Sequence, residues 1–113
     1  MRAYELMIII DGEVDESGVQ AQITKVTEFV EAEGGRIATT DNWGKKRFAY
    51  EINHKWEGTY VVLEILTEAN LDTSDRALRL ADDVVRHKIM RLPEHEAERR
   101  GLFGETAAAT SDA

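Results

Sequence analysis

The sequence predicts an α+β fold, in which a four-stranded antiparallel sheet carries two helices on one face. Four segments are rich in branched and aromatic apolar residues, as strands are. Two other segments repeat apolar residues every three or four positions, as amphipathic helices do. Their order along the chain is strand, helix, strand, strand, helix, strand. Two right-handed split β-α-β units in this order form the ferredoxin-like β-α-β-β-α-β plait.

The first strand and the first helix have clear boundaries. Residues 4–10 are nearly continuously apolar, which is typical of a central strand, and the polar residues 11–13 end it. Ser17 and Gln20 have the spacing of a capping box, so the helix is expected to begin there. Two glycines at 34–35 end it. One apolar stripe follows the predicted helix, formed by Val19, Ile23, Val26 and Val30.

A β-hairpin is expected in the middle of the chain. A short strand at residues 36–40 leads to Gly44, where a bend or bulge is expected. Residues 48–52 alternate between apolar and other side chains, so every second residue should face the core. The side chains expected on that face are Phe48, Tyr50 and Ile52. A polar turn at 53–58 leads to the clearest strand, residues 59–66.

The last two elements and a tail complete the chain. A helix is expected over residues 73–81 and a strand over 84–92, which Pro93 ends because proline cannot donate a ladder hydrogen bond. After Pro93 the apolar pattern disappears. We therefore expect a ferredoxin-like domain over residues 1–92 and a mobile tail over 93–113. The apolar pair at 102–103 is expected to be unpaired, with a short docking motif as the alternative.

Composition limits the possible classes of protein. The chain has 113 residues, 14 Lys and Arg against 22 Asp and Glu, a net charge of -8 and no cysteine. Disulfides and thiolate metal sites are excluded, and bulk electrostatic binding of nucleic acid is disfavoured. A local basic patch remains possible, because screening limits electrostatic attraction to about 8–10 Å at physiological salt. The longest apolar run is far shorter than the roughly 20 residues that span a bilayer, so we expect a cytoplasmic protein without a membrane segment.

No arrangement of residues typical of an enzyme is present. His54, His87 and His95 are scattered, and His95 lacks the second histidine of a zinc-protease helix. The acidic residues at 11–13 would repel phosphate, and those at 82–83 are typical of a polar turn. We therefore expect no catalytic residue, no metal, no cofactor and no small-molecule substrate.

The cations fall into two groups that fit a contact with phosphates. One is the run Lys45, Lys46 and Arg47, which is expected in a basic turn before the aromatic strand. The other lies in the second helix and the last strand and consists of Arg76, Arg79, Arg86, Lys88 and Arg91. Arg2 joins this group if the first and last strands are neighbours, as in a plait. Ordinary solvated surface charge is the alternative interpretation of both groups.

Several motifs resemble the family of bacterial small-subunit ribosomal protein six. They are residues 1–5 with the aliphatic strand that follows, residues 34–36, residues 43–52 with the sequence WGKKRFAYEI, and residues 85–91. The resemblance covers about residues 1–92. Phe48 departs from it, because the family usually has leucine there, and the exchange remains apolar.

The resemblance implies a non-enzymatic, ribosome-associated protein of the cytoplasm. Family members have the ferredoxin-like fold and bind the central domain of 16S ribosomal RNA, as a heterodimer with ribosomal protein eighteen, during assembly of the 30S platform. The residues expected to contact RNA are Arg2, Arg79, Arg86, Lys88 and Arg91. Those expected to contact either the protein partner or RNA are Lys45, Lys46, Arg47 and Tyr50. The alternative function is a small-molecule-sensing regulatory module with the same fold, since fold alone does not decide function.

Overall fold

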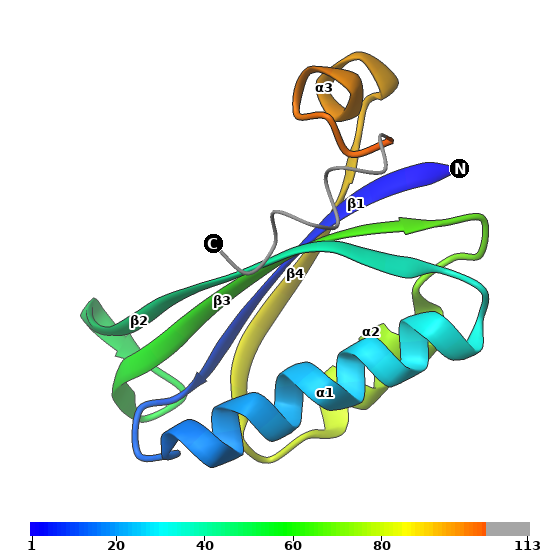
Figure 1. Cartoon of the computed structure of the whole chain (residues 1–113). Coiled ribbons are helices and arrows are strands. Elements are labelled where there is room, and N and C mark those ends of the chain that lie inside the picture. Colours follow the sequence, from blue (N-terminus) through cyan, green and yellow to red (C-terminus); the bar gives the residue numbers. More distant parts are fainter. Residues whose placement is uncertain (104–113) are drawn as a thin grey trace.

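A computed structural model, which describes residues 1–103, contains the six expected elements in the expected order, followed by a third, short helix (Figure 1). The strands are β1 (Arg2–Asp11), β2 (Arg36–Ile52), β3 (Lys55–Thr67) and β4 (Val84–Leu92). The helices are α1 (Glu16–Ala32), α2 (Asp72–Leu80) and α3 (Glu94–Arg99).

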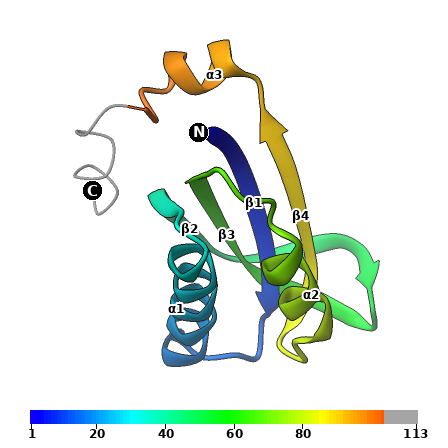
Figure 2. The ribbon, with the colours of Figure 1, turned by 90° about the vertical axis from the view of Figure 1, so that its right-hand side faces the viewer.

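The four strands form one antiparallel sheet in the order β2-β3-β1-β4. Strand β1 lies in the middle and pairs with β3 on one side and β4 on the other. Helices α1 and α2 lie side by side against one face of this sheet (Figure 2). The predicted ferredoxin-like plait is therefore confirmed. We call the face opposite to α1 and α2 the open face.

The main core lies between the sheet and these two helices. Successive residues of a strand face opposite sides, so Leu6, Ile8 and Ile10 of β1 point to the helices. All three side chains are fully buried. The apolar stripe of α1 covers them and is itself buried, with members Val19, Ile23, Val26 and Val30. The predicted stripe is thus the face of α1 that packs on the sheet.

Helix α1 begins slightly earlier than the capping-box spacing indicates. Asp15 is the N-cap, and its Oδ1 accepts a hydrogen bond of 2.9 Å from the backbone N–H of Gly18. Ser17 is already inside the helix, and its hydroxyl donates to the same Asp15 oxygen. The expected start at Ser17 is wrong because the carboxylate two residues earlier takes the cap. The expected end holds, since Gly34 has a φ of 86° just after the helix.

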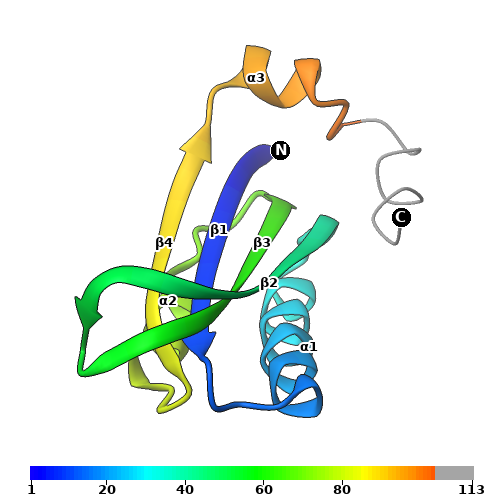
Figure 3. The ribbon, with the colours of Figure 1, turned by 90° about the vertical axis from the view of Figure 1, so that its left-hand side faces the viewer.

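The β2–β3 hairpin has longer strands and a shorter turn than expected. Strand β2 continues through Gly44, which has a φ of 84°, and the turn consists of Asn53 and His54, with φ of 49° and 63°. Two left-handed residues in a two-residue turn match the twist of the strands. The basic run at 45–47 therefore lies inside β2, and its expected place in a turn is wrong. Figure 3 shows the hairpin extending past β1 and across β4.

A large bulge near the tip of this hairpin changes which side chains face inward. Arg47 pairs with Glu57 and Ile52 with Lys55, so residues 48–51 lie opposite Trp56 alone. The additional residues break the alternation of side chains. Phe48 and Ile52 are buried on the open face, where they cluster with Ile9, whereas Tyr50 is 64% exposed. The expected burial of Tyr50 is therefore wrong.

Residues 93–103 also differ from the expected tail. Helix α3 follows Pro93 directly, and Ala97 and Leu102 are buried against the end of the open face. The expectation of an unpaired Leu102 is wrong, because its side chain fills a place on the sheet. Residues 104–113, the rest of the expected tail, lie outside the described residues.

Candidate nucleic-acid interface

Two of the expected RNA-contacting residues, Arg86 and Lys88, lie together on the open face. In β4 they pair with Ile9 and Met7 of β1, whose side chains face away from α1 and α2. Both cations are exposed, and within residues 1–103 neither forms a salt bridge. Two solvated cations two positions apart on one strand can each contact a phosphate.

Arg91 and Arg2 form a second location at the far end of the sheet. Arg91 pairs with Tyr4 and therefore faces the opposite side from Arg86 and Lys88. Arg2 and Arg91 line one shallow pocket. The Arg2 guanidinium donates to the backbone carbonyl of Glu68. Arg2, Arg86, Lys88 and Arg91, which the sequence analysis places in one group, therefore form two separate pairs.

Arg79 is separated from both pairs. It lies on α2 and forms a salt bridge with Asp75 one turn earlier. The other oxygen of Asp75 contacts Nε2 of His87 on β4 at 2.7 Å. The hydrogen bond with His87 and the nearby charge of Arg79 lower the pKa of Asp75. Arg79 is thus partly neutralised on the helix side, unlike Arg86 and Lys88.

The three cations of the basic run do not point the same way. Lys45 pairs with Thr59 and lines a shallow pocket beside Asp15 and Glu16, at the start of α1. Lys46, the next residue, faces the opposite side of the hairpin.

The guanidinium carbon of Arg47 lies 5.7 Å from the ring centroid of Trp56. This is within the range of a cation–π contact. The run therefore presents charge on both sides of an overhanging hairpin.

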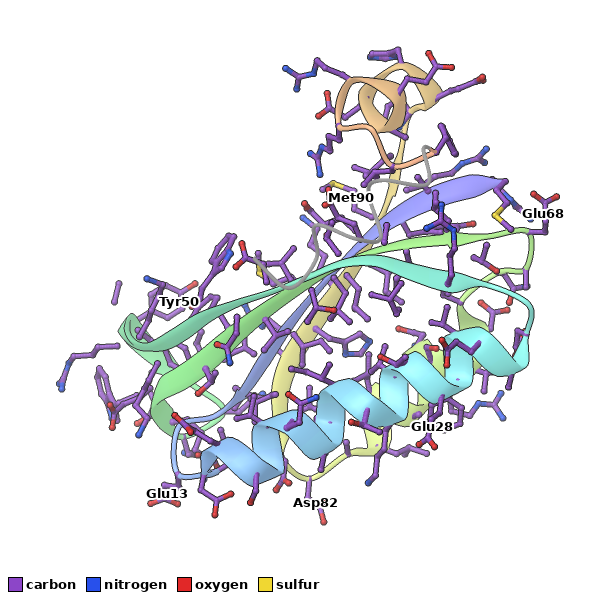
Figure 4. All side chains as sticks on the ribbon, viewed as in Figure 1. Glu13, Glu28, Tyr50, Glu68, Asp82 and Met90 are labelled. Atoms are coloured by element: carbon purple, nitrogen blue, oxygen red, sulfur yellow. The ribbon has the colours of Figure 1, made fainter. Side chains whose placement is uncertain are left out.

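The open face between the hairpin tip and α3 also carries exposed apolar groups. Tyr50 is 64% exposed and Met90 43% exposed, and both lie on the side of the sheet away from α1 (Figure 4). Trp43, which is 47% exposed, stacks on Tyr60 with ring centroids 6.4 Å apart. Apolar side chains mixed with unpaired cations are typical of surfaces that bind a protein or RNA.

The part of the chain that the structure describes has no cluster of potential metal ligands. Within residues 1–103 no group of three or more His, Asp or Glu is placed to hold a metal ion. His87 is tied to Asp75, and His54 lies in the hairpin turn beside Glu51. None of the helices in residues 1–103 is long and apolar enough to cross a membrane.

Sequence reasoning missed one charged cluster. Arg100, after α3, contacts Glu64 at 2.7 Å, Glu96 at 2.7 Å and Glu5 at 3.2 Å. These carboxylates raise the pKa of the Arg100 guanidinium, and Arg100 and Arg99 lower the pKa of Glu96. The signal in the sequence was the spacing of Glu96 to Arg99 and Arg100, which allows ion pairs only if this segment is helical.

The chain is similar to known ribosomal proteins over most of its length. A family model described as Ribosomal protein S6 matches residues 3–91. The "Small ribosomal subunit protein bS6" of Desulforamulus reducens is 44% identical over 92 residues, which are 80% of this chain and 97% of that protein. The protein of the same name from Corynebacterium efficiens is 45% identical over 93 residues, 81% of this chain and 98% of its own length.

Solved structures agree with the fold. The crystal structure of 30S ribosomal protein S6 from Thermotoga maritima has a TM-score of 0.78 and 28% identity, and covers 88% of this chain and 95% of that one. The P2 domain of the chemotaxis kinase CheA from Thermotoga maritima, solved with the response regulator CheY, has a TM-score of 0.52 and 15% identity. The match to the P2 domain covers 80% of this chain and 98% of that one, and it shows the fold alone.

Proposed function

The chain belongs to the ribosomal protein S6 family, a non-enzymatic component of the bacterial small ribosomal subunit, and on this premise we propose that it binds the central domain of 16S ribosomal RNA together with ribosomal protein eighteen. As a ribosomal protein it is associated with ribosomes in the cytoplasm. The two proteins form a heterodimer that contributes to the 30S platform. Nothing in the described residues favours the alternative of a small-molecule sensor.

The observation that carries this proposal is the pair Arg86 and Lys88 on the open face. Phosphate contacts by Lys and Arg provide most of the sequence-independent affinity of RNA-binding proteins. The two cations are exposed and free of salt bridges within residues 1–103, so binding a phosphate breaks no ion pair of the folded chain. Arg2 and Arg91 supply a second, weaker phosphate contact at the end of the sheet, because Glu94 and Glu98 line the same pocket.

The overhanging hairpin is the proposed contact for the protein partner, with RNA as its second possible neighbour. Lys45, Lys46, Arg47 and Tyr50 are all exposed on it. Tyr50 offers an apolar ring with a hydroxyl at its edge, a combination that is common at protein interfaces. The net charge of -8 fits this division, because a basic partner then provides much of the phosphate contact.

The test is a salt series with a double variant. Arg86→Ala with Lys88→Ala should weaken binding to a 16S central-domain fragment in the presence of ribosomal protein eighteen. The slope of log affinity against log salt should fall by about one unit for each phosphate that the variant no longer binds. Filter binding or fluorescence anisotropy over the series measures both quantities.

The matched control removes two exposed cations from the helix side, Lys25→Ala with Arg76→Ala. It changes the net charge equally and should leave the slope unchanged. If both double variants change the slope to the same extent, the effect reflects net charge, and the assignment of Arg86 and Lys88 is wrong. If the wild-type chain does not bind with or without the partner, the proposed function itself fails.

A further inference from the structure

The end of the open face under α3 is an apolar row to which each strand contributes one residue. Ala3 of β1 pairs with Leu66 of β3 and with Leu92 of β4, and Ala38 of β2 completes the row. Residues 93–103 cover it. Ala97 is 0% exposed and Leu102 is 1% exposed, and both belong to the same cluster. Two small alanines in the row leave the space that Leu102 fills.

One side chain ties this covering segment to the sheet through charge. Arg100 contacts Glu5 of β1 and Glu64 of β3, which are directly paired neighbours. Thr39 of β2 donates a hydrogen bond of 2.6 Å to the other oxygen of Glu64 and so orients this carboxylate. Within residues 1–103, Arg100 is the only cation that forms a salt bridge with Glu5 or Glu64.

The sheet under the cover lies within the segment that the family model matches, whereas the cover lies after it. The family match ends at residue 91, before Pro93 and α3. The aligned residues make up 97% of the Desulforamulus reducens relative, which leaves that protein only a few residues for any counterpart of residues 93–103. The cover therefore lies beyond the segment that the family model matches, in a part of the chain for which a relative of this length has little counterpart.

We propose that residues 93–103 are a built-in cover that competes with a basic protein partner for this end of the open face, with Arg100 as its latch. The partner segment that fits presents an arginine to Glu5 and Glu64 and a small apolar side chain to the row of Ala3, Ala38, Leu66 and Leu92. It would replace the contacts of Arg100 and Leu102 with contacts of the same kind. A short segment held by so few contacts can open while the sheet stays folded.

The charge of the site selects protein over RNA. Two adjacent carboxylates at the centre of the patch repel phosphate and attract a guanidinium, which can bond to both. This inference rests on the proposed function, because ribosomal protein eighteen is the partner with which it is tested.

The test compares two neighbouring arginines. Arg100→Ala removes the latch and frees Glu5 and Glu64, so the affinity for ribosomal protein eighteen should rise about threefold to tenfold, the usual effect of removing a partly exposed ion pair. Arg99→Ala is the matched control, because Arg99 bonds only to Glu96 within residues 1–103. It should leave the affinity unchanged. Titration calorimetry with the full chain measures the affinity of each variant for ribosomal protein eighteen.

A second measurement follows the cover itself. The backbone N–H of Leu102 donates to the carbonyl of Ala97 at 3.0 Å, a bond within residues 93–103. A helix of six residues is not stable in water without its packing partner, so hydrogen exchange of this amide reports whether the segment is docked. Protection of this amide should disappear when the partner binds to the wild-type chain. Adding Glu5→Gln and Glu64→Gln to Arg100→Ala should reverse the rise in affinity, because the partner's arginine then has no carboxylates to bind.

The outcomes separate this inference from the proposed function. If the wild-type chain binds the partner and Arg100→Ala binds equally or more weakly, the cover does not compete, although the proposed partnership stands. Protection of Leu102 that persists in the complex overturns the inference in the same way. If neither the wild-type chain nor Arg100→Ala binds, both proposals fail.

Discussion

At the scale of single residues, Asp75 connects α2 to the sheet. One of its oxygens contacts His87 of β4 at 2.7 Å, and the other pairs with Arg79. Its pKa is held below the ordinary value of 3.8, first by the hydrogen bond with His87 and then by the charges of Arg79 and His87. A carboxyl group with a lowered pKa in the folded state stabilises that state while it is ionised.

Asp75→Asn should therefore destabilise the protein in a pH-dependent way. Above the unfolded-state pKa near 3.8 the full contribution is present, and we expect a destabilisation of about 0.5–1 kcal/mol, the range of partly exposed pairs. As pH falls through the lower pKa that Asp75 has in the folded state, the wild-type chain loses the stabilisation that the ionised carboxylate provides. The difference in unfolding free energy between the wild-type chain and Asp75→Asn should therefore vanish. Urea unfolding from about pH 5 to about pH 3 measures it.

Asp72→Asn is the control for this measurement. Asp72 also lies in the first turn of α2, but it forms no salt bridge within residues 1–103. A destabilisation by Asp75→Asn that stays constant with pH would show that the charge of this carboxylate is not the source.

At the scale of elements, α3 is attached to the sheet less extensively than α1. Its own buried residue is Ala97, and Leu102 follows just after the helix. By contrast, α1 buries five residues: Val19, Gln22, Ile23, Val26 and Val30. A segment with so few buried contacts has a low free energy of local opening.

Leu102→Ala should consequently cost less than an equivalent change in the main core. Leu63→Ala should destabilise the protein by about 3–5 kcal/mol, as expected for a fully buried leucine. Leu102 is equally buried, but its truncation cannot cost more than the free energy that docks residues 93–103, and we expect about 1–2 kcal/mol. Urea unfolding of both variants gives the comparison. Equal destabilisation would mean that α3 and the sheet unfold as one unit.

At the scale of the whole molecule, an acidic chain presents exposed cations on the open face and on the hairpin. The net charge is -8, yet Arg86 and Lys88 lie free on the open face and the basic run lies on the overhanging hairpin. Exposed acidic residues such as Glu28 and Glu31 lie on α1, on the other side of the sheet. Such segregation lets one face approach an anion although the molecule as a whole is repelled.

The same net charge predicts how stability responds to salt. Repulsion within the folded chain is screened as salt rises, so the urea midpoint should increase between about 0.01 M and about 0.15 M salt. Glu28→Lys reduces the net negative charge at an exposed site and should reduce this increase. A midpoint that falls with salt in the wild-type chain would show that the ion pairs around Arg100 and Asp75 outweigh the general repulsion.

The sequence by itself determined the six elements of the plait, their order and the family. The stripe of α1, the central strand β1 and the end of β4 at Pro93 follow from local periodicity and from the chemistry of glycine and proline, which any chain segment expresses on its own. The family motif at residues 43–52 can be recognised without the structure, because it consists of residue types in order and does not depend on the direction of their side chains.

Only the tertiary structure decided which side chains come together. The bulge at 48–51 turns Tyr50 outward. The pairing of β4 with β1 decides that Arg86 and Lys88, and not Arg91, lie on the open face. Leu102 and Arg100 looked like parts of an unpatterned tail, since their partners Ala3, Glu5 and Glu64 lie far away in sequence. Contacts of this kind form only when the sheet has brought distant strands side by side, so they cannot be predicted from the pattern of neighbouring residues in the sequence.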